Sequence, residues 1–550
     1  MKRTLLILPS LIVLAACSVH MGEVSEEERI PPPSPPPAPP PPPPSPMMSE
    51  MIAVTGSRLA QPLVLAEPQP SDRDRFEDVD PNPVIAVADE AVSTFSIDVD
   101  TASYAVVRNY LRDGRLPPSD AVRIEEMINY FDYDYALPEA GEPFATHVAV
   151  TPNPWNPDTQ LLHIGLQGYE IIPEERPRAN LVFLIDVSGS MTAPDKLPLA
   201  IEAMRMLVDE LDDEDTVSIA VYAGAAGAVL EPTEARHADR IHAALDRLRA
   251  GGSTAGGAGL SLAYNMAERN FDPEAVNRVM LLTDGDFNVG VTSDERLEDF
   301  VARKRESGIY LSVMGFGRGN YNDQMMQAIA QAGNGVAGYI DSREEARRML
   351  VEEASSSLFP IAEDVKIQIE FNPARVSEYR LIGYETRLLD EADFNNDAVD
   401  AGEVGSGHSV TAIYEIAAPG SAGALLEPSR YQPQPDVAED LNSEYAFLRL
   451  RYKPPGEEDS LLMERAITQD DWVASFEAAS APVRFSTQIA GFAQILRGDP
   501  YLADETYDYD AIANWANGAL GEDEYGFRAE FIELVEIAQQ LSGPGGPKTP

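Results

Sequence analysis

The chain has 550 residues, enough for roughly two to four domains of ordinary size. Its 91 acidic residues against 41 basic ones give a formal net charge of −50, which excludes binding to nucleic acid or to an anionic membrane surface by overall charge. The six histidines show neither catalytic nor zinc-binding spacing, and Cys17 is the only cysteine, so no intramolecular disulfide can form.

The N-terminus predicts a lipid-anchored protein of the cell envelope. Residues 1–16 have a basic start and then an apolar stretch too short to span a bilayer, so they are predicted to be a signal peptide. The motif Leu14-Ala-Ala-Cys17 resembles a bacterial lipoprotein signal, which implies cleavage before Cys17 and acylation of its thiol and new amino group. Multiple acyl chains anchor a protein stably. By the same resemblance, Ser18 after the cysteine favours the outer membrane over the inner membrane.

Residues 17–90 are predicted to be a lipid-anchored, proline-rich, disordered stalk. Pro31 to Pro46 is almost all proline, which favours extended polyproline II and a semi-rigid spacer about 50 Å long. Residues 47–90 stay polar and proline-rich, and we expect them to be largely disordered. A proline-rich ligand for a recognition domain is the alternative interpretation of the run.

Residues 91–177 and 360–541 are predicted to be β-rich flanks of a central domain, followed by a disordered tail at 542–550. The first flank has predicted helices at 101–112 and 122–130 and predicted strands at 144–151 and 160–166. In the second flank the predicted strands are 362–371, 376–387, 407–416 and 444–452, and the predicted helices are 483–497 and 527–541. Because a domain can be inserted where its termini lie close together, we expect strands of both flanks to pair.

The central domain, residues 178–359, alternates strands and helices. Continuous apolar runs such as Leu181–Ile185 indicate strands buried on both faces, which are typical of a parallel sheet. Alternation with short connections predicts an α/β fold with a doubly wound, mainly parallel, Rossmann-like sheet. The expected elements are strand 181–185, helix 197–211, strands 216–222 and 228–230, helices 234–249 and 257–269, a strand leading to Asp284, helix 294–306, strand 309–316, helix 322–332, strand 338–341 and helix 342–358.

Oxygen-bearing side chains follow two of these strands. Asp186, Ser188 and Ser190 stand at alternate positions after the first strand, and Asp284 ends a later one. Thr254 lies between them, on a glycine-rich loop that opens a helix. Ligands of open α/β sheets bind just beyond the carboxyl ends of the strands, and hard oxygen ligands suit a small divalent cation such as Mg²⁺.

This order of residues resembles the metal-ion-dependent adhesion site of von Willebrand factor type A domains. The resemblance implies that Asp186, Ser188, Ser190, Thr254 and Asp284 hold a metal ion directly or through water. The ion would be Mg²⁺, with Mn²⁺ or Ca²⁺ as alternatives. The resemblance also implies an open coordination position, which accepts an acidic side chain of a partner protein.

The flanks resemble a bacterial family of von Willebrand type A lipoproteins. Phe95–Tyr104 and Arg123–Phe131 are similar to the N-terminal region of that family. Phe485–Arg497 and Tyr525–Phe531 are similar to its C-terminal domain of unknown function. The resemblance covers about residues 91–541 and implies the architecture, but it implies no biochemical activity.

Three functions remain open on the sequence. A non-enzymatic binding module is favoured, and a structural envelope component whose metal only braces loops is a second interpretation. The enzymatic alternative is a Mg²⁺-dependent phosphohydrolase, although a haloacid-dehalogenase-like enzyme would need a second Asp where Ser188 stands.

A separate acidic stretch, Asp393–Asp397, follows a calcium-loop pattern only in part. Ala398 and Val404 stand where an EF-hand requires Gly and Glu. We therefore interpret this stretch as a solvated acidic loop.

Overall fold

The structure of the protein is a computed structural model, and all its described residues belong to one compact unit within residues 68–550. It describes residues 74–171, 176–252, 256–285, 294–319, 321–352, 358–397, 399, 401–427, 443–457, 459–502, 507–523 and 525–543. The predicted signal peptide, Cys17, the proline run and Thr254 lie outside the described residues.

A six-stranded sheet forms the centre of the domain predicted at residues 178–359. Its strands are β5 Ala179–Asp186, β6 Thr216–Tyr222, β7 Ala226–Glu234, β8 Val276–Thr283, β9 Ile309–Phe316 and β10 Ala337–Ile340. The order is β10-β9-β8-β5-β6-β7, and only β7 runs antiparallel to its neighbour. Every residue of β5 is buried, which explains its continuous apolar sequence. The expected α/β, mainly parallel sheet is therefore confirmed.

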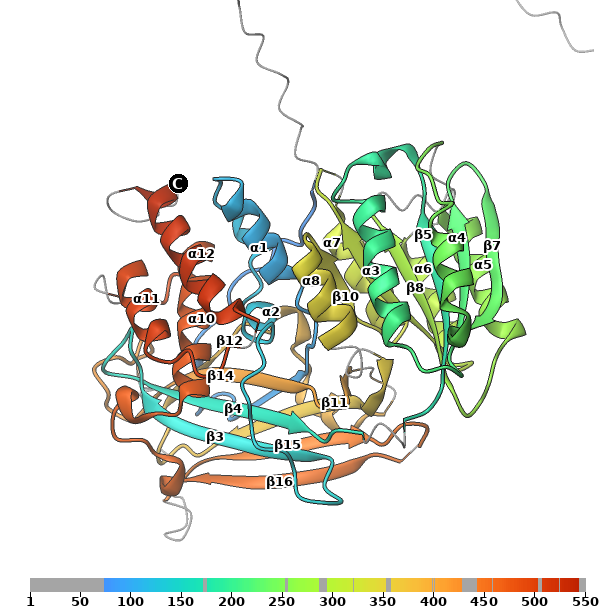
Figure 1. Cartoon of the computed structure of the whole chain (residues 1–550). Coiled ribbons are helices and arrows are strands. Elements are labelled where there is room, and N and C mark those ends of the chain that lie inside the picture. The colour runs from blue at the N-terminus through green and yellow to red at the C-terminus, as the bar shows by residue number, and fades with distance from the viewer. Residues whose placement is uncertain are drawn as a thin grey trace, which may run out of the picture. The chain divides into compact units, whose positions relative to one another are not determined.

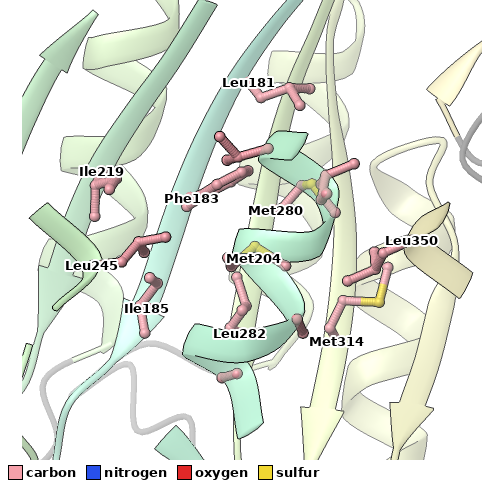
Figure 2. Close-up of a cluster of buried hydrophobic side chains, with 14 of the residues drawn as sticks. Leu181, Phe183, Ile185, Met204, Ile219, Leu245, Met280, Leu282, Met314 and Leu350 are labelled. Carbon is pink, nitrogen blue, oxygen red and sulfur yellow. The ribbon is translucent and has the colours of Figure 1, made fainter. Parts of the chain in front are cut away.

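Helices cover both faces of this sheet. They are α3 Leu197–Glu210, α4 Ala238–Leu245, α5 Gly256–Arg269, α6 Asp294–Arg305, α7 Asp323–Ala332 and α8 Arg343–Arg347. One face packs on α3, α4 and α8, and Figure 2 shows Met204 of α3 among Phe183 of β5 and Leu282 of β8. The other face packs on α5, α6 and α7. The doubly wound arrangement is thus also confirmed. β7 is longer than expected and extends to Glu234, so the helix predicted at 234–249 begins only at Ala238.

Strands from both flanks pair with each other, as the insertion of a central domain predicts. They are β1 Ile85–Ala86, β2 Val92–Ser96, β3 Phe144–Pro152, β4 Gln160–Gly168, β11 Pro360–Phe371, β12 Glu378–Ile382, β13 Gly402–Gly405, β14 Ser409–Ala417, β15 Glu444–Lys453 and β16 Leu461–Thr468. One sheet has the order β1-β12-β14-β4-β3, and the other has β13-β11-β15-β16 with β2 beside β11. The β4–β14 and β2–β11 pairs join residues on opposite sides of the central domain.

Five helices of the flanks share an aromatic core. They are α1 Ala102–Arg112, α2 Ile124–Ile128, α10 Ala481–Arg497, α11 Tyr509–Asn517 and α12 Phe527–Ser542 (Figure 1). Phe531 of α12 lies against the rings of Phe131, Phe485 and Phe492, each 5.4 to 6.1 Å away between ring centres. α11 did not emerge from the sequence pattern. None of the helices in the described part of the chain is long and apolar enough to cross a membrane.

Residues 74–90 are folded, which corrects the expectation that the disordered stalk extends to residue 90. β1 pairs with β12, and the backbone N–H of Arg75 donates to the carbonyl oxygen of Tyr321. The Asp74 carboxylate accepts hydrogen bonds of 2.9 Å from the backbone N–H groups of Gly319 and Tyr321. Polar, proline-rich composition predicted disorder here, but backbone pairing with distant segments orders the chain from Asp74 onward.

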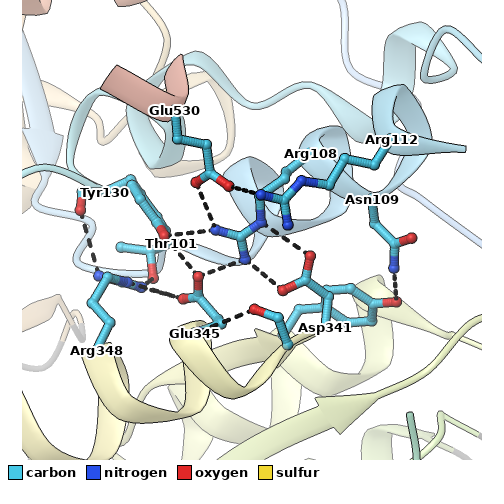
Figure 3. A network of polar contacts seen from close by, with 11 residues as sticks. Thr101, Arg108, Asn109, Arg112, Tyr130, Asp341, Glu345, Arg348 and Glu530 are labelled. Atoms are coloured by element: carbon cyan, nitrogen blue, oxygen red, sulfur yellow. Dashed lines mark hydrogen bonds and ion pairs between the residues drawn. The ribbon is translucent and has the colours of Figure 1, made fainter. Parts of the chain in front are cut away.

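Buried ion pairs join the central domain to the helices of the flanks. Arg108 of α1 contacts Glu345 of α8 and Asp341, and its Nη1 donates to the Tyr130 hydroxyl (Figure 3). Arg348 also pairs with Glu345, at 2.7 Å. These side chains are nearly fully buried, so the α8 end of the central domain is held firmly against α1 and the segment that follows α2.

Candidate metal centre

Asp186 and Asp284 stand at the carboxyl ends of two neighbouring parallel strands. Asp186 is the last residue of β5, and Asp284 directly follows β8. Because β5 and β8 pair in parallel register, both carboxylates reach the same edge of the sheet. Each of the two residues is fully buried. The sequence-based expectation that the strands bring these side chains to one edge is met.

The turn after β5 arranges the two serine hydroxyls. The backbone N–H of Ser188 donates to Asp186 Oδ1 at 2.7 Å, which fixes the direction of the turn. The hydroxyls of Ser188 and Ser190 lie 2.9 Å apart, so the alternate spacing in the sequence places both on the same side. Ser188 is buried, whereas Ser190 is partly exposed. The turn therefore carries a partly exposed serine at the sheet edge that holds two buried carboxylates.

The glycine-rich loop that carries Thr254 is anchored against this turn. The N–H of Gly251 donates to the Val187 carbonyl at 2.7 Å, and the N–H of Gly189 donates to the Gly252 carbonyl at 3.0 Å. α5 then begins at Gly256. Thr254 itself lies outside the described residues, so its contribution to the site stays a prediction.

Burial makes the charge of Asp186 costly. Burial, and to a smaller extent the nearby Asp284, raise the pKa of Asp186 to about 6 against the hydrogen bonds from Ser188, which lower it. The Tyr222 hydroxyl also favours the charged form. Even so, Oδ2 of Asp186 is buried and has no hydrogen-bond partner among the described residues. A bound cation would compensate both the charge and this oxygen.

Lys196 is a part of the site that sequence reasoning missed. Its ammonium donates to Oδ2 of Asp284 at 2.9 Å, and its side chain is 8% exposed. Lys196 is the only basic residue between Arg178 and Arg205, and that isolation near the Asp-x-Ser-x-Ser motif is the signal that could have identified it.

The residues present fit a small divalent cation. Two carboxylates and two hydroxyls are hard oxygen ligands, as Mg²⁺ and Mn²⁺ require. No group of three or more His, Cys, Asp or Glu side chains in the described part of the chain could hold a metal ion, so a site at this edge depends on its hydroxyl oxygens. Oδ1 of Asp186 is already bonded within the protein, which leaves Oδ2 as its free ligand atom.

The acidic stretch at Asp393–Asp397 contacts two basic side chains. Arg451 pairs with Asp397 at 2.9 Å, and Lys366 donates to the backbone carbonyls of Asp393 and Asn396. The acidic loop predicted from the sequence thus carries an ion pair at Asp397 and backbone contacts with Lys366.

Comparison with known proteins identifies the family. The Escherichia coli (strain K12) protein YfbK is 43% identical over 476 residues, which cover 85% of this chain and 81% of that protein. The chain belongs to the YfbK family. Family models match it in three parts: von Willebrand factor over residues 70–163, von Willebrand factor type A domain over 180–352, and the YfbK C-terminal model over 356–541. The predicted membership of a bacterial family with a type A domain and this C-terminal domain is thereby confirmed.

Other similar proteins match this chain at lower identity. The Synechocystis protein sll0103 is 30% identical over 173 residues, 32% of this chain and 40% of that protein. Among solved structures, a von Willebrand factor type A protein from Catenulispora acidiphila covers 72% of this chain and 91% of its own, with 17% identity and a TM-score of 0.39. BatB from Bacteroides thetaiotaomicron covers 32% and 97%, with 25% identity and a TM-score of 0.28.

Proposed function

We propose that this YfbK-family protein is a non-enzymatic, lipid-anchored envelope protein that binds a partner protein through a divalent metal ion. Type A domains mediate protein–protein interactions and commonly bind such an ion. The proposed ligands are Asp186, Ser188, Ser190, Thr254 and Asp284. The observation that carries the proposal is the unpartnered, buried Oδ2 of Asp186, which lies beside Ser188 and Asp284 at one sheet edge.

The proposed partner presents an acidic side chain. When bound, the metal ion would supply an open coordination position that a carboxylate can fill. The chain's own part is to orient the ligands: the Ser188 N–H holds Asp186, and the hydrogen bond between the two hydroxyls holds Ser188 and Ser190 together. A charge-assisted contact of this kind gains strength in a site that is already arranged and partly dehydrated.

The local contacts favour binding over phosphate hydrolysis. A phosphohydrolase of the haloacid-dehalogenase type needs a carboxylic acid two residues after its nucleophile, and Ser188 fills that position with its N–H bonded to Asp186. The flanks contain a serine–histidine pair, Ser486 and His163, at 2.9 Å. Both residues are almost fully buried, and burial lowers the pKa of His163 to about 3, so the pair is part of the core.

The envelope location follows from the N-terminus and is also part of the proposal. Acylation of Cys17 would anchor the chain, most favourably in the outer membrane, and the proline run would hold the folded part away from the bilayer surface. The net charge of −50 would oppose adsorption of the folded part to anionic lipid.

The test is a pull-down from envelope extract with Mg²⁺ or with EDTA. Wild type should retain a partner only with Mg²⁺, and Asp186→Asn should lose it. Asp195→Asn is the matched control, because Asp195 lies on the same loop and is exposed. Identical bound proteins in all lanes would contradict the proposal. So would steady hydrolysis of aryl phosphates by the wild type that Asp186→Asn abolishes.

A further inference from the structure

Lys196 reaches the candidate metal site from the same loop that carries the serines. Ser190 lies in a short 3-10 helix at Gly189–Thr192, and the chain then reaches Lys196 just before α3 begins. The side chain then turns back to the sheet edge, where Nζ lies 2.9 Å from Oδ2 of Asp284. The helix dipole disfavours a positive charge at the N-terminus of a helix. The contact with the Asp284 carboxylate offsets this electrostatic cost for Lys196.

The loop after β9 is shaped to accommodate the lysine stem. Gly317 follows β9 with φ +66°, a left-handed conformation that favours glycine. A β-carbon at this position would lie 2.4 Å from Cγ and 2.6 Å from Cε of Lys196. The glycine therefore leaves the space in which the stem of Lys196 lies. Two separate elements, the α3 N-terminus and the β9 loop, hold the ammonium on the carboxylate.

We propose that Lys196 is a built-in competitor of the divalent ion and sets the metal affinity of the site. This inference rests on the proposed function, because it concerns regulation of the same site. Asp186 and Asp284 together carry two negative charges, which a divalent ion balances alone. With the ammonium on Asp284, the site holds one negative charge, and a divalent ion entering it meets a like charge.

Competition has a structural consequence for the loop. Metal coordination through Oδ2 of Asp284 requires the ammonium to leave that oxygen. Since Lys196 and the two serines belong to one short loop, its release changes the loop that borders the open side of the site. Metal loading and the shape of the partner-binding surface are thereby linked.

The experiment measures Mn²⁺ binding to the full-length protein by isothermal titration calorimetry, in parallel with thermal unfolding with and without Mn²⁺. Lys196→Met keeps the apolar stem and removes the charge, and we expect it to bind Mn²⁺ at least about tenfold more tightly than wild type. Lys196→Arg keeps the charge and should show no such gain. The rise in Tm on adding Mn²⁺ should be larger for Lys196→Met than for wild type.

The outcomes separate this inference from the proposed function. If Lys196→Met binds Mn²⁺ no more tightly than wild type, the proposal that Lys196 competes with the ion is wrong. Weaker binding than wild type would show that the lysine orients Asp284 instead. Tight binding by Lys196→Met that Asp186→Asn abolishes in the same background supports both proposals. If wild type and Lys196→Met both stay folded and neither binds Mn²⁺, the metal site itself is wrong.

A second measurement uses only the wild-type protein and covers the case in which Lys196→Met does not fold. Brief treatment with acetic anhydride, followed by mass spectrometry, reports the reactivity of each lysine. Saturating Mn²⁺ should raise the acetylation of Lys196 several-fold. Lys304, which pairs with Glu268 and not with a proposed metal ligand, serves as the internal reference. Unchanged Lys196 acetylation in protein shown to bind Mn²⁺ overturns the inference.

Discussion

Arg108 and Glu345 form a buried ion pair across the boundary between the first flank and the type A domain, with 2.6 Å between Nη2 and Oε2. Each side chain is 1% exposed. Because Asp341 and Tyr130 contact the same guanidinium, the pair belongs to a network that settles how the inserted domain sits on its neighbours (Figure 3).

Removing Arg108 should strongly destabilise the protein. Arg108→Ala leaves Glu345 and Asp341 buried with less compensation, and we expect the free energy of unfolding to fall by about 3–5 kcal/mol. Arg112→Ala is the control, because the Arg112 side chain is 51% exposed and its partner Glu530 keeps Arg108 as a second partner. It should cost less than about 1 kcal/mol. Urea unfolding measures both, and equal losses for the two variants would contradict the importance of the buried network.

Phe531 should be a major contributor to the helical core. It is fully buried and packs edge-on against three other phenylalanines. Phe531→Ala should lower the free energy of unfolding by about 3–5 kcal/mol, since it leaves a cavity. Phe271→Ala, at a side chain that is 41% exposed, should cost much less. A loss below about 1 kcal/mol for Phe531→Ala would show that α12 is not part of the cooperative core.

The buried carboxyl of Asp100 should give the protein a recognisable pH dependence. Burial raises the pKa of Asp100 to about 7, and the neighbouring Asp98 adds to the shift. The folded state therefore binds more protons than the unfolded state between about pH 4 and pH 7, so stability falls as the pH rises through this range. The contribution is at most about 1.4 kcal/mol per pH unit.

The variant Asp100→Asn tests this prediction through the slope of the free energy of unfolding against pH. The free energy of unfolding of wild type, measured in urea from pH 4 to pH 8, should fall relative to that of Asp100→Asn up to about pH 7 and then run parallel. Asp120→Asn, at an exposed position, should leave the wild-type slope unchanged. Parallel curves for wild type and Asp100→Asn across the whole range would mean that this carboxyl titrates near its ordinary pKa.

Mg²⁺ should stabilise the folded state in proportion to its binding. At an ion concentration about 100 times Kd, the gain is about 2.7 kcal/mol for one site. Differential scanning calorimetry should show a rise in Tm for wild type and for Asp195→Asn, and none for Asp186→Asn. A rise that Asp186→Asn preserves would place the ion elsewhere in the molecule.

Cys17 should be necessary for membrane attachment. Cys17→Ser removes the predicted acylation site, so incorporation of labelled palmitate should disappear and the protein should leave the membrane fraction after cell lysis. Ser18→Asp is a separate variant that keeps the cysteine and should retain the label. Label in Cys17→Ser would disprove the predicted anchor.

The sequence alone was sufficient where the signal is local. Apolar runs such as Leu181–Ile185 predict buried parallel strands. A strand covered on both faces has no solvent-facing side, so its sequence does not alternate between apolar and polar residues. The motif Asp-x-Ser-x-Ser likewise predicted oxygen-bearing side chains just beyond the end of the first strand, where the hydroxyls of Ser188 and Ser190 lie 2.9 Å apart. The family, the type A domain and the pairing of the flanks followed from such patterns.

Only the tertiary structure decided the features that depend on distant partners. Residues 74–90 fold because they find backbone partners near Tyr321 and in β12, hundreds of residues away, and their composition carries no trace of those contacts. Lys196 enters the site because Gly317 and Asp284, from other strands, meet it in space. The charge balance of the site, with a lysine among its carboxylates, is therefore a property of the fold, because electrostatic energy depends on distance in space and not along the chain.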